Sequence, residues 1–148
     1  MLRWLDMPPV WLALFCAAGW AHGPVAGLPR AGGWATPPGW ALVVIGLALV
    51  IAAAVEFRHH RTTIIPREAP SALIDSGVFR LTRNPVYLGD ALVLAGVCLI
   101  LRQPAALWLV PAFMALVTRR FIRGEEAGLR AAFPQAAPAY MARVRRWL

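Results

Sequence analysis

Lysine is absent from this chain of 148 residues, and cysteine and the acidic residues are scarce. The fifteen basic residues are all arginine, against seven Asp and Glu, which gives a net charge of +8. Charged residues make up 15% of the chain, where soluble domains average about 25%. The two cysteines, Cys16 and Cys98, both fall in apolar runs, which argues against a disulfide framework or a cysteine metal site. A glycine-rich fingerprint of the soluble dinucleotide-binding type is also missing.

Apolar residues take the place of the missing charges. Hydrophobic residues make up 59% of the chain. Counted with glycine and without tyrosine, about two thirds of the chain is apolar, against roughly 45–50% in soluble domains. A soluble globule of this size has no interior large enough for that excess, so an ordinary cytosolic enzyme and a disordered chain are both excluded. We therefore expect residues 1–148 to form one all-α domain, a helix bundle embedded in the lipid bilayer.

Four apolar runs are long enough, or nearly so, to cross a bilayer. A helix needs about 20 residues to span roughly 30 Å of hydrocarbon, and somewhat shorter runs are tolerated. Only Arg102 and Gln103 separate the last two runs, which predicts a helical hairpin whose tip reaches the far interface as Arg102 snorkels. A cleaved signal peptide is the alternative for the first run, although Asp6 lies in what would be its basic leader. The predicted spans are residues 10–29, 37–55, 85–101 and 104–118, followed by a C-terminal segment, 119–148, with an amphipathic helix.

Arginine is distributed unevenly between the loops that join these spans. Cytoplasmic loops retain basic residues near the ends of spans. Placing both termini in the cytoplasm leaves Arg30 and Arg102 outside and the other thirteen arginines inside. We therefore expect a multi-pass protein of the cell membrane with both termini cytoplasmic, and the Ala- and Arg-rich composition suggests a bacterial inner membrane. The same asymmetry accounts for the high pI, so no nucleic-acid partner is expected.

The two polar segments on the cytoplasmic side, residues 56–84 and 119–148, are where we expect any chemistry. Asn84 at the N-cap and Pro85 at the first helical position predict the start of the third span. Its unpaired amides would favour an anion in a cytoplasmic pocket, although a well-capped transmembrane helix is the simpler interpretation. Asp90 follows within the span. It either faces a polar cavity or only benefits from the positive end of the helix, and both interpretations stay open.

Other patterns in these segments have both a structural and a functional interpretation. Gly89 and Gly96 predict close approach of a neighbouring helix. Glu125 and Glu126 form either a solvated face or part of a ligand site. His59 and His60 have no further ligands at metal-binding spacing, so no metal is expected. An amphipathic stripe near the C-terminus predicts an interfacial helix or a lid over the pocket, and its members are Leu129, Phe133, Tyr140, Val144 and Leu148.

Residues 63–148 carry a series of motifs in a fixed order. The central one is Arg83-Asn84-Pro85-Val86-Tyr87-Leu88-Gly89, of the form Arg-(His or Asn)-Pro-x-Tyr-x-Gly. Thr63-Ile64-Ile65-Pro66 and the segment 73–79 precede it, and the Glu-Glu pair, Tyr140 and a basic tail follow it. In this series the chain resembles the integral membrane methyltransferases of the isoprenylcysteine carboxyl methyltransferase and phospholipid methyltransferase type. The resemblance implies a methyltransferase that uses S-adenosylmethionine.

The resemblance also implies roles for individual residues. Arg83, Arg119 and Arg120 would orient the acceptor. The chain departs from the family near its end, where Pro134 replaces a glycine and a tyrosine is lost, and also at Phe79 and Gly124. These departures affect the lid and the acceptor site more than cofactor binding. The cofactor-binding residues would be Leu73, Ile74, Phe79, Asn84, Pro85, Val86, Tyr87, Gly89, Glu125 and Glu126.

The chemistry of this cofactor suits the residues present. The helix start at Asn84 could hold its carboxylate, Glu125 its ammonium or ribose hydroxyls, and Tyr87 or Phe79 its sulfonium or adenine. A carboxylate acceptor needs only an arginine to orient it, whereas an amine acceptor needs a base, for which Asp90 is available.

The basic rim favours a carboxylate on a lipid-like or prenylated acceptor that enters from the bilayer. A phospholipid amine is the second acceptor that the residues allow. Two competing interpretations of the whole chain also stay open: a membrane reductase that uses a nicotinamide cofactor, and a non-enzymatic membrane bundle.

Overall fold

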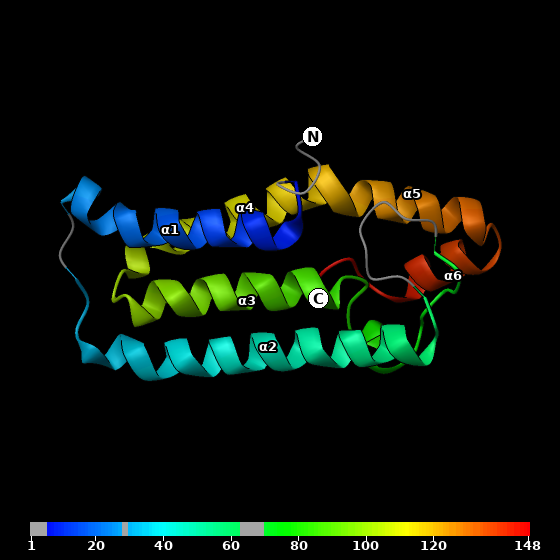
Figure 1. The fold of residues 1–148 in the computed structure, drawn as a ribbon, viewed down its shortest axis with the longest axis horizontal. Helices are drawn as coiled ribbons and strands as arrows, with labels where there is room; N and C mark the ends of the chain where they lie inside the picture. The colour runs from blue at the N-terminus through cyan, green and yellow to red at the C-terminus, as the bar shows by residue number, and fades with distance from the viewer. Residues whose placement is uncertain (1–5, 28–29, 63–69) are drawn as a thin grey trace.

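Every regular element in the described part of the chain is helical (Figure 1). The computed structural model describes residues 6–27, 30–62 and 70–148. Helices make up 76% of this structure, and no strand occurs within those ranges. This confirms the predicted all-α fold. The α-helices are α1 (Pro8–Ala26), α2 (Thr36–His59), α3 (Pro85–Ile100), α4 (Leu109–Val117), α5 (Arg123–Ala132) and α6 (Ala136–Arg143). Short 3₁₀ turns are η1 (Gly33–Ala35), η2 (Gly77–Arg80) and η3 (Pro104–Trp108), and η4 (Thr118–Ile122) is a π-helical turn that joins α4 to α5.

Proline marks the first turn of each long helix. Pro8 begins α1, Pro37 follows the first residue of α2, and Pro85 begins α3. Proline is tolerated there because the first amides of a helix have no partner inside it and the ring sets the helical φ angle in advance. The predicted helix start at Pro85 is therefore confirmed.

Helix α3 lies in the middle of the bundle, with α2 along one side and α1 and α4 along the other (Figure 1). Its apolar face packs on α4, and Phe15 of α1 meets Phe113 of α4 edge to face with ring centroids 5.4 Å apart. Because α3 is covered on both sides, its first turn lies inside the molecule. The buried residues of this core are Tyr87, Ala91, Leu94, Cys98, Ala106, Leu109, Phe113, Val117, Phe121 and Ile122.

Glycines bring α2 and α3 into backbone contact. A Cβ placed on Gly46 would lie 2.6 Å from the carbonyl oxygen of Gly89, and one placed on Gly39 would lie 2.8 Å from that of Gly96. Small residues allow helices to approach this closely where lipid provides no hydrophobic force between them. The predicted close approach at Gly89 and Gly96 is confirmed, and α2 is the helix that approaches.

Replacing Gly46 with valine should separate α2 from α3, because the nearest obstacle is backbone and not a movable side chain. We expect the free energy of unfolding to fall by about 2–3 kcal/mol, the upper part of the range for an overpacked interior. Thermal unfolding in detergent, followed by circular dichroism, measures this. Ala48→Val adds the same kind of side chain at an exposed position of α2 and should have little effect. Equal losses in both variants would contradict the packing argument.

The end of the bundle opposite α5 and α6 is closed by the turn between α3 and η3. Gln103 is buried there, and its side-chain oxygen accepts a hydrogen bond from the Gly23 amide at 2.6 Å while its amide group donates to the Trp20 carbonyl at 3.2 Å. Arg102 is exposed and donates to the Ala31 carbonyl at 2.9 Å. The predicted hairpin is present, and its tip is attached to α1 and to the segment before α2.

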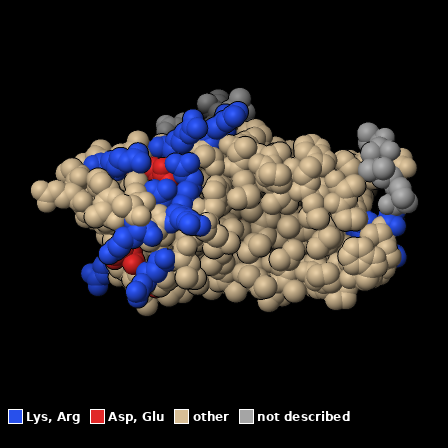
Figure 2. All heavy atoms as spheres, turned by 180° about the vertical axis from the view of Figure 1, so that it is seen from behind, with Lys and Arg blue, Asp and Glu red and all other residues tan. Residues whose placement is uncertain are grey.

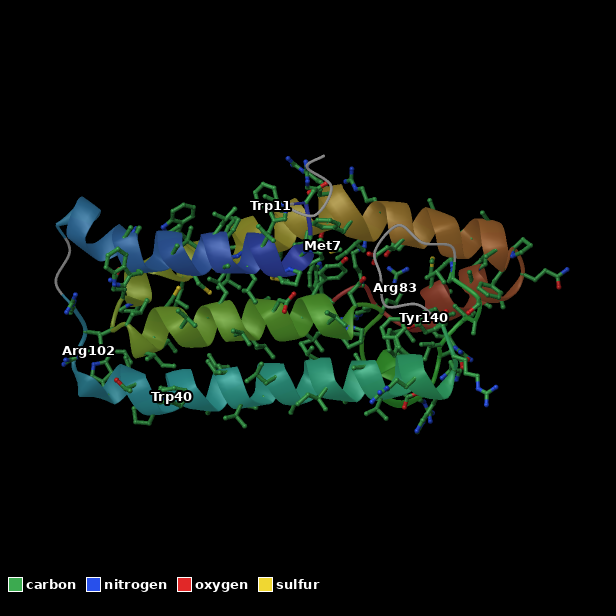
Figure 3. All side chains as sticks on the ribbon, in the orientation of Figure 1. Met7, Trp11, Trp40, Arg83, Arg102 and Tyr140 are labelled. Atoms are coloured by element: carbon green, nitrogen blue, oxygen red, sulfur yellow. The ribbon has the colours of Figure 1, made fainter. Side chains whose placement is uncertain are left out.

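Two continuous helical segments of the described chain are long and apolar enough to cross a membrane, Gly33–His59 and Pro104–Ala132, and Pro85–Ile100 is a shorter apolar helix. Arginines gather at one end of the molecule, while most of the visible face is uncharged (Figure 2). Arg83 and Tyr140 lie at that end, and Arg102 lies at the other (Figure 3). Large apolar side chains of α2 are exposed along its length, including Trp40 and Ile51. The distribution of charge and apolar surface is therefore polarised along the helices.

The C-terminal segment contains two short helices in place of one. Helix α5 ends before Phe133 and α6 begins after Gln135, with Pro134 in the turn. Helix α6 folds back beneath α5 in the view of Figure 1. Tyr140 and Val144, two members of the predicted stripe, are buried inside the protein. The arrangement agrees with the lid interpretation of this segment more closely than with a free helix on the membrane surface.

Candidate active site

A cavity of about 700 Å³ opens where α3 begins and α5 and α6 meet the end of α2. Its volume lies within the range of about 300–1,000 Å³ that is common for small-molecule sites. Its walls are mostly apolar, with a few convergent polar groups. The lining residues fall into three groups. The start of α1 with the residue before it, and α2, contribute Met7, Pro8, Pro9, Val50 and Phe57, and the segment between α2 and α3 contributes Thr62, Pro70, Ala72, Leu73, Ile74 and Phe79. The start of α3 with the residues just before it, α5 and α6 contribute Arg83, Asn84, Val86, Tyr87, Asp90, Gly124, Glu125, Glu126, Gly128, Leu129, Tyr140 and Met141.

The first turn of α3 is joined to α5 by a short hydrogen bond. The hydroxyl of Tyr87 donates to Oε1 of Glu125 at 2.6 Å. Tyr87 is buried, and its ring stacks on Phe121 with centroids 6.2 Å apart. The central motif and the acidic pair, which are 38 residues apart in sequence, therefore form one wall of the cavity.

Glu126 is buried and forms a cluster with two arginines. Its carboxylate accepts two hydrogen bonds from Arg146, at 2.9 and 2.7 Å, and lies 3.4 Å from the guanidinium of Arg83. The hydrogen bond to Glu126 raises the pKa of Arg146 above its ordinary value, although burial opposes this. The two-fold contact with Arg146 is the geometry that makes arginine–carboxylate pairs strong. Glu125 and Glu126 are therefore adjacent in sequence but have different partners.

The C-terminal tail binds the start of α3 through backbone groups. Asn84 Nδ2 and Thr82 Oγ1 both donate to the Arg146 carbonyl, at 2.9 and 3.1 Å, and the Arg83 amide donates to the Arg145 carbonyl at 3.0 Å. Asn84 is the N-cap residue of α3, as predicted, but its side chain makes no capping hydrogen bond. The side chain is instead oriented toward the tail, where Nδ2 donates to the Arg146 carbonyl. The first amides of any helix have no carbonyl acceptor within the helix, and those of α3 are at the cavity end of the bundle.

Aromatic side chains form the opposite wall. Phe79 is buried and meets Phe57 of α2 edge to face, with centroids 5.4 Å apart. Tyr140 of α6 donates to the Phe79 carbonyl at 2.8 Å. Burial raises the pKa of Tyr140 to about 12, so its hydroxyl keeps its proton at neutral pH. Helix α6 is thereby attached to the segment that carries Phe79 and Ile74.

The structure brings most of the predicted site residues into this one cavity. Four of them lie outside its lining: Pro85, Gly89, Arg119 and Arg120. Gly89 faces Gly46 of α2, and Arg119 is exposed. The residues that do line the cavity are Leu73, Ile74, Phe79, Arg83, Asn84, Val86, Tyr87, Glu125 and Glu126.

Arg120 has another partner. It forms an ion pair with Asp6, and its guanidinium lies 5.4 Å from the centre of the Trp11 ring. It therefore attaches the start of α1 to the π-helical turn η4. The orientation of an acceptor by Arg119 and Arg120, as predicted from the sequence, has no support in the placement of these two residues.

Several lining residues were not among the predicted ones. Val50 and Phe57 come from the middle and end of α2, and Met7 to Pro9 come from the start of α1. Their sequence signal is that of a span and its end, which does not distinguish a cavity wall from a lipid-facing surface. The Thr63-Ile64-Ile65-Pro66 motif lies outside the described residues.

The geometry defines a class of protein: a helical bundle with helices apolar enough to cross a membrane, and a small-molecule cavity at its arginine-rich end. A family model described as phospholipid methyltransferase matches residues 34–136, more than two thirds of the chain. The chain belongs to this family, and membership implies a methyltransferase. A search of curated proteins finds no match. The matched range includes the central motif and the acidic pair.

Proposed function

We propose that this protein transfers a methyl group from S-adenosylmethionine to a lipid-like acceptor at the membrane. The observation that supports this most strongly is the cavity that Asn84, Tyr87 and Glu125 line together. The hydrogen bond between Tyr87 and Glu125 holds the central motif and the acidic pair together. The residues that would bind the cofactor on this wall thus have a fixed relative position.

The polar groups of the cavity fit the cofactor. S-adenosylmethionine carries a carboxylate, an ammonium, a ribose, an adenine and a sulfonium. The amides at the start of α3 suit the carboxylate, and Arg83 Nε is buried without a hydrogen-bond partner among the described residues. Glu125 suits the ammonium or the ribose hydroxyls, and the Phe79 ring suits the adenine. The carboxylate, the adenine and either the ammonium or the ribose therefore have complementary groups on the wall.

When bound, the cofactor would supply a methyl group on a sulfonium. A nucleophile can attack that methyl group and displace the sulfur as a neutral thioether. The residues of the chain bind and orient the two substrates, because an in-line displacement depends mainly on alignment and on exclusion of water. The walls of the cavity are apolar over most of their area, and α6, attached through Tyr140, covers one side of it. These features supply the alignment and the exclusion of water that the reaction requires.

A lipid-like acceptor is supported by the depth of the cavity. Val50 lies seven residues before Phe57 on α2, which is about 10 Å along the helix axis. The cavity therefore extends from the arginine-rich end into the apolar part of the bundle. Of the arginines expected to orient an acceptor carboxylate, Arg83 alone lines it, and Glu126 lies 3.4 Å from its guanidinium. Support for a carboxylate acceptor of the isoprenylcysteine type is thereby reduced to one arginine that already lies beside a carboxylate.

We further propose that α1, α2, α3 and the segment formed by η3 and α4 each cross the bilayer, with both termini in the cytoplasm. The arginines of α5, α6 and the tail gather at the end that carries the cavity, and Arg102 lies at the opposite end (Figures 2 and 3). Retention of basic residues on the cytoplasmic side then places the cavity at the cytoplasmic surface of the cell membrane. Cysteine accessibility at Arg102→Cys and Arg143→Cys in intact cells tests this orientation.

Calorimetric titration of the detergent-solubilised protein with S-adenosylmethionine tests the function. We expect saturable binding of one molecule per chain. Binding of NADPH in its place would indicate a membrane reductase, and saturable binding of neither ligand would indicate a non-enzymatic bundle. Either result would overturn the proposal.

A further inference from the structure

Asp90 is an acidic residue in the apolar part of the cavity. It lies one turn beyond Val86 on α3 and lines the cavity with that residue. Pro8 and Pro9 of α1 and Val50 of α2 line it as well. An acid in a membrane-spanning segment is costly, and such residues usually face a cavity or a partner. Asp90 faces the cavity.

Asp90 differs from the other acids of the described chain in its partners. It makes no hydrogen bond or ion pair with any described residue. The other described acids all have partners: Asp6 with Arg120, Glu56 with Ser76, Asp75 with Arg143, Glu125 with Tyr87, and Glu126 with Arg83 and Arg146.

The positive end of α3 does not explain Asp90. The helix begins at Pro85, so Asp90 is its sixth residue and lies beyond the first turn. The favourable effect of a helix start on an acid falls off within that turn. Of the two interpretations that the sequence leaves open, the cavity-facing one therefore agrees with the structure.

We propose that Asp90 binds the amine headgroup of a lipid acceptor and removes its proton before methyl transfer. This rests on the proposed methyltransferase function and specifies its acceptor. Among the described residues, the charges that line the cavity are three acids, Asp90, Glu125 and Glu126, and one base, Arg83. An ammonium group supplies the cation that Asp90 lacks, whereas a carboxylate acceptor beside Asp90 would place two like charges together in an apolar site.

The reaction balances with this one residue as the base. The ammonium of the acceptor gives a proton to the Asp90 carboxylate, which leaves a neutral amine and a carboxylic acid. The lone pair of the amine forms the new nitrogen–carbon bond while the carbon–sulfur bond of the sulfonium breaks and its electrons stay on sulfur. The methylated amine carries the positive charge away, and Asp90 returns its proton to water.

Methyl transfer from labelled S-adenosylmethionine to vesicles of phosphatidylethanolamine tests Asp90. We expect transfer by the wild-type protein and a loss of about a hundredfold or more in Asp90→Asn, as for removal of a general base. Cofactor affinity should stay within about threefold, a change of less than 1 kcal/mol. Asp75→Asn makes the same change at an exposed ion pair outside the cavity and should leave both quantities unchanged.

A second measurement uses no cofactor. Native mass spectrometry should show that the wild-type protein retains phosphatidylethanolamine more than phosphatidylglycerol of the same chains, and that Asp90→Asn loses this preference. If the wild type methylates a farnesylcysteine carboxylate and Asp90→Asn does so equally well, the proposed role of Asp90 is overturned while the methyltransferase function stands. Loss of cofactor binding in Asp90→Asn would make Asp90 a cofactor ligand and would overturn it too. Absence of cofactor binding in the wild type would instead refute the proposed function.

Discussion

Glu125→Ala is expected to weaken binding of S-adenosylmethionine by about tenfold to a hundredfold. Hydrogen bonds to a charged group contribute about 1.5–3 kcal/mol, which corresponds to that range of affinity. Glu125 lines the cavity beside Tyr87, where it would meet the ammonium or the ribose of the cofactor. Combining Glu125→Ala with Asn84→Ala should remove detectable binding, because the second change also disturbs the start of α3.

Calorimetric titration of the purified variants measures these affinities. Arg123→Ala provides the control, because Arg123 is an exposed residue of the same helix and lies outside the cavity. Thermal unfolding of each variant separates loss of a ligand contact from loss of fold. A doubly substituted protein that folds and still binds the cofactor with wild-type affinity would remove Glu125 and Asn84 from the site.

Replacing Glu126 with alanine should lower the free energy of unfolding by about 3 kcal/mol, the loss typical of removing one partner from a buried ion pair. The side chain of Glu126 is 6% exposed and that of Arg83 is 14% exposed. Without the carboxylate, the Arg83 guanidinium would lose its counter-charge in a nearly buried position, beside the Arg146 side chain, which is 35% exposed. The tail that carries Arg146 also binds Asn84, so its release should loosen the start of α3 as well.

Denaturant or thermal unfolding in detergent measures this loss. Asp75→Asn is the matched control, because the ion pair between Asp75 and Arg143 has side chains 55% and 67% exposed. Exposed pairs contribute about 0–1 kcal/mol, so this variant should unfold almost as the wild type does. A similar loss in both variants would show that the burial of the Glu126 cluster has no energetic consequence.

Much of the bundle was predictable because its signals are local. Apolar runs and prolines at helix starts depend on neighbours along the chain. They predicted the long helices and the start of α3 at Pro85. Glycines at a spacing of seven residues predicted the contact of α3 with another helix, since only close approach requires them. The amphipathic stripe near the C-terminus was visible as well, although a helix folded back on the cavity was only one of its two interpretations.

The candidate site was predictable where residues belong to motifs and less so where orientation matters. Tyr87 and Glu125 were both expected in the pocket, yet nothing in the sequence indicates that they bond to each other. Arg119 and Arg120 lie in the π-helical turn η4, which changes the direction in which successive side chains point. Arg120 consequently lies against Trp11 and not in the cavity.

The sequence by itself determined that this chain forms apolar helices with arginine distributed unevenly between the loops, and its motifs, through the family resemblance, identified nine of the residues that line the cavity. The helices follow from composition and from apolar runs, whereas the site residues follow from the resemblance. Only the tertiary structure decided that Glu126 pairs with Arg146 while Glu125 meets Tyr87, and that Asp90 has no partner among the described residues. The physical reason is that hydrogen bonds and ion pairs act over a few ångströms, so their formation depends on where the tail and α5 fold back against α3.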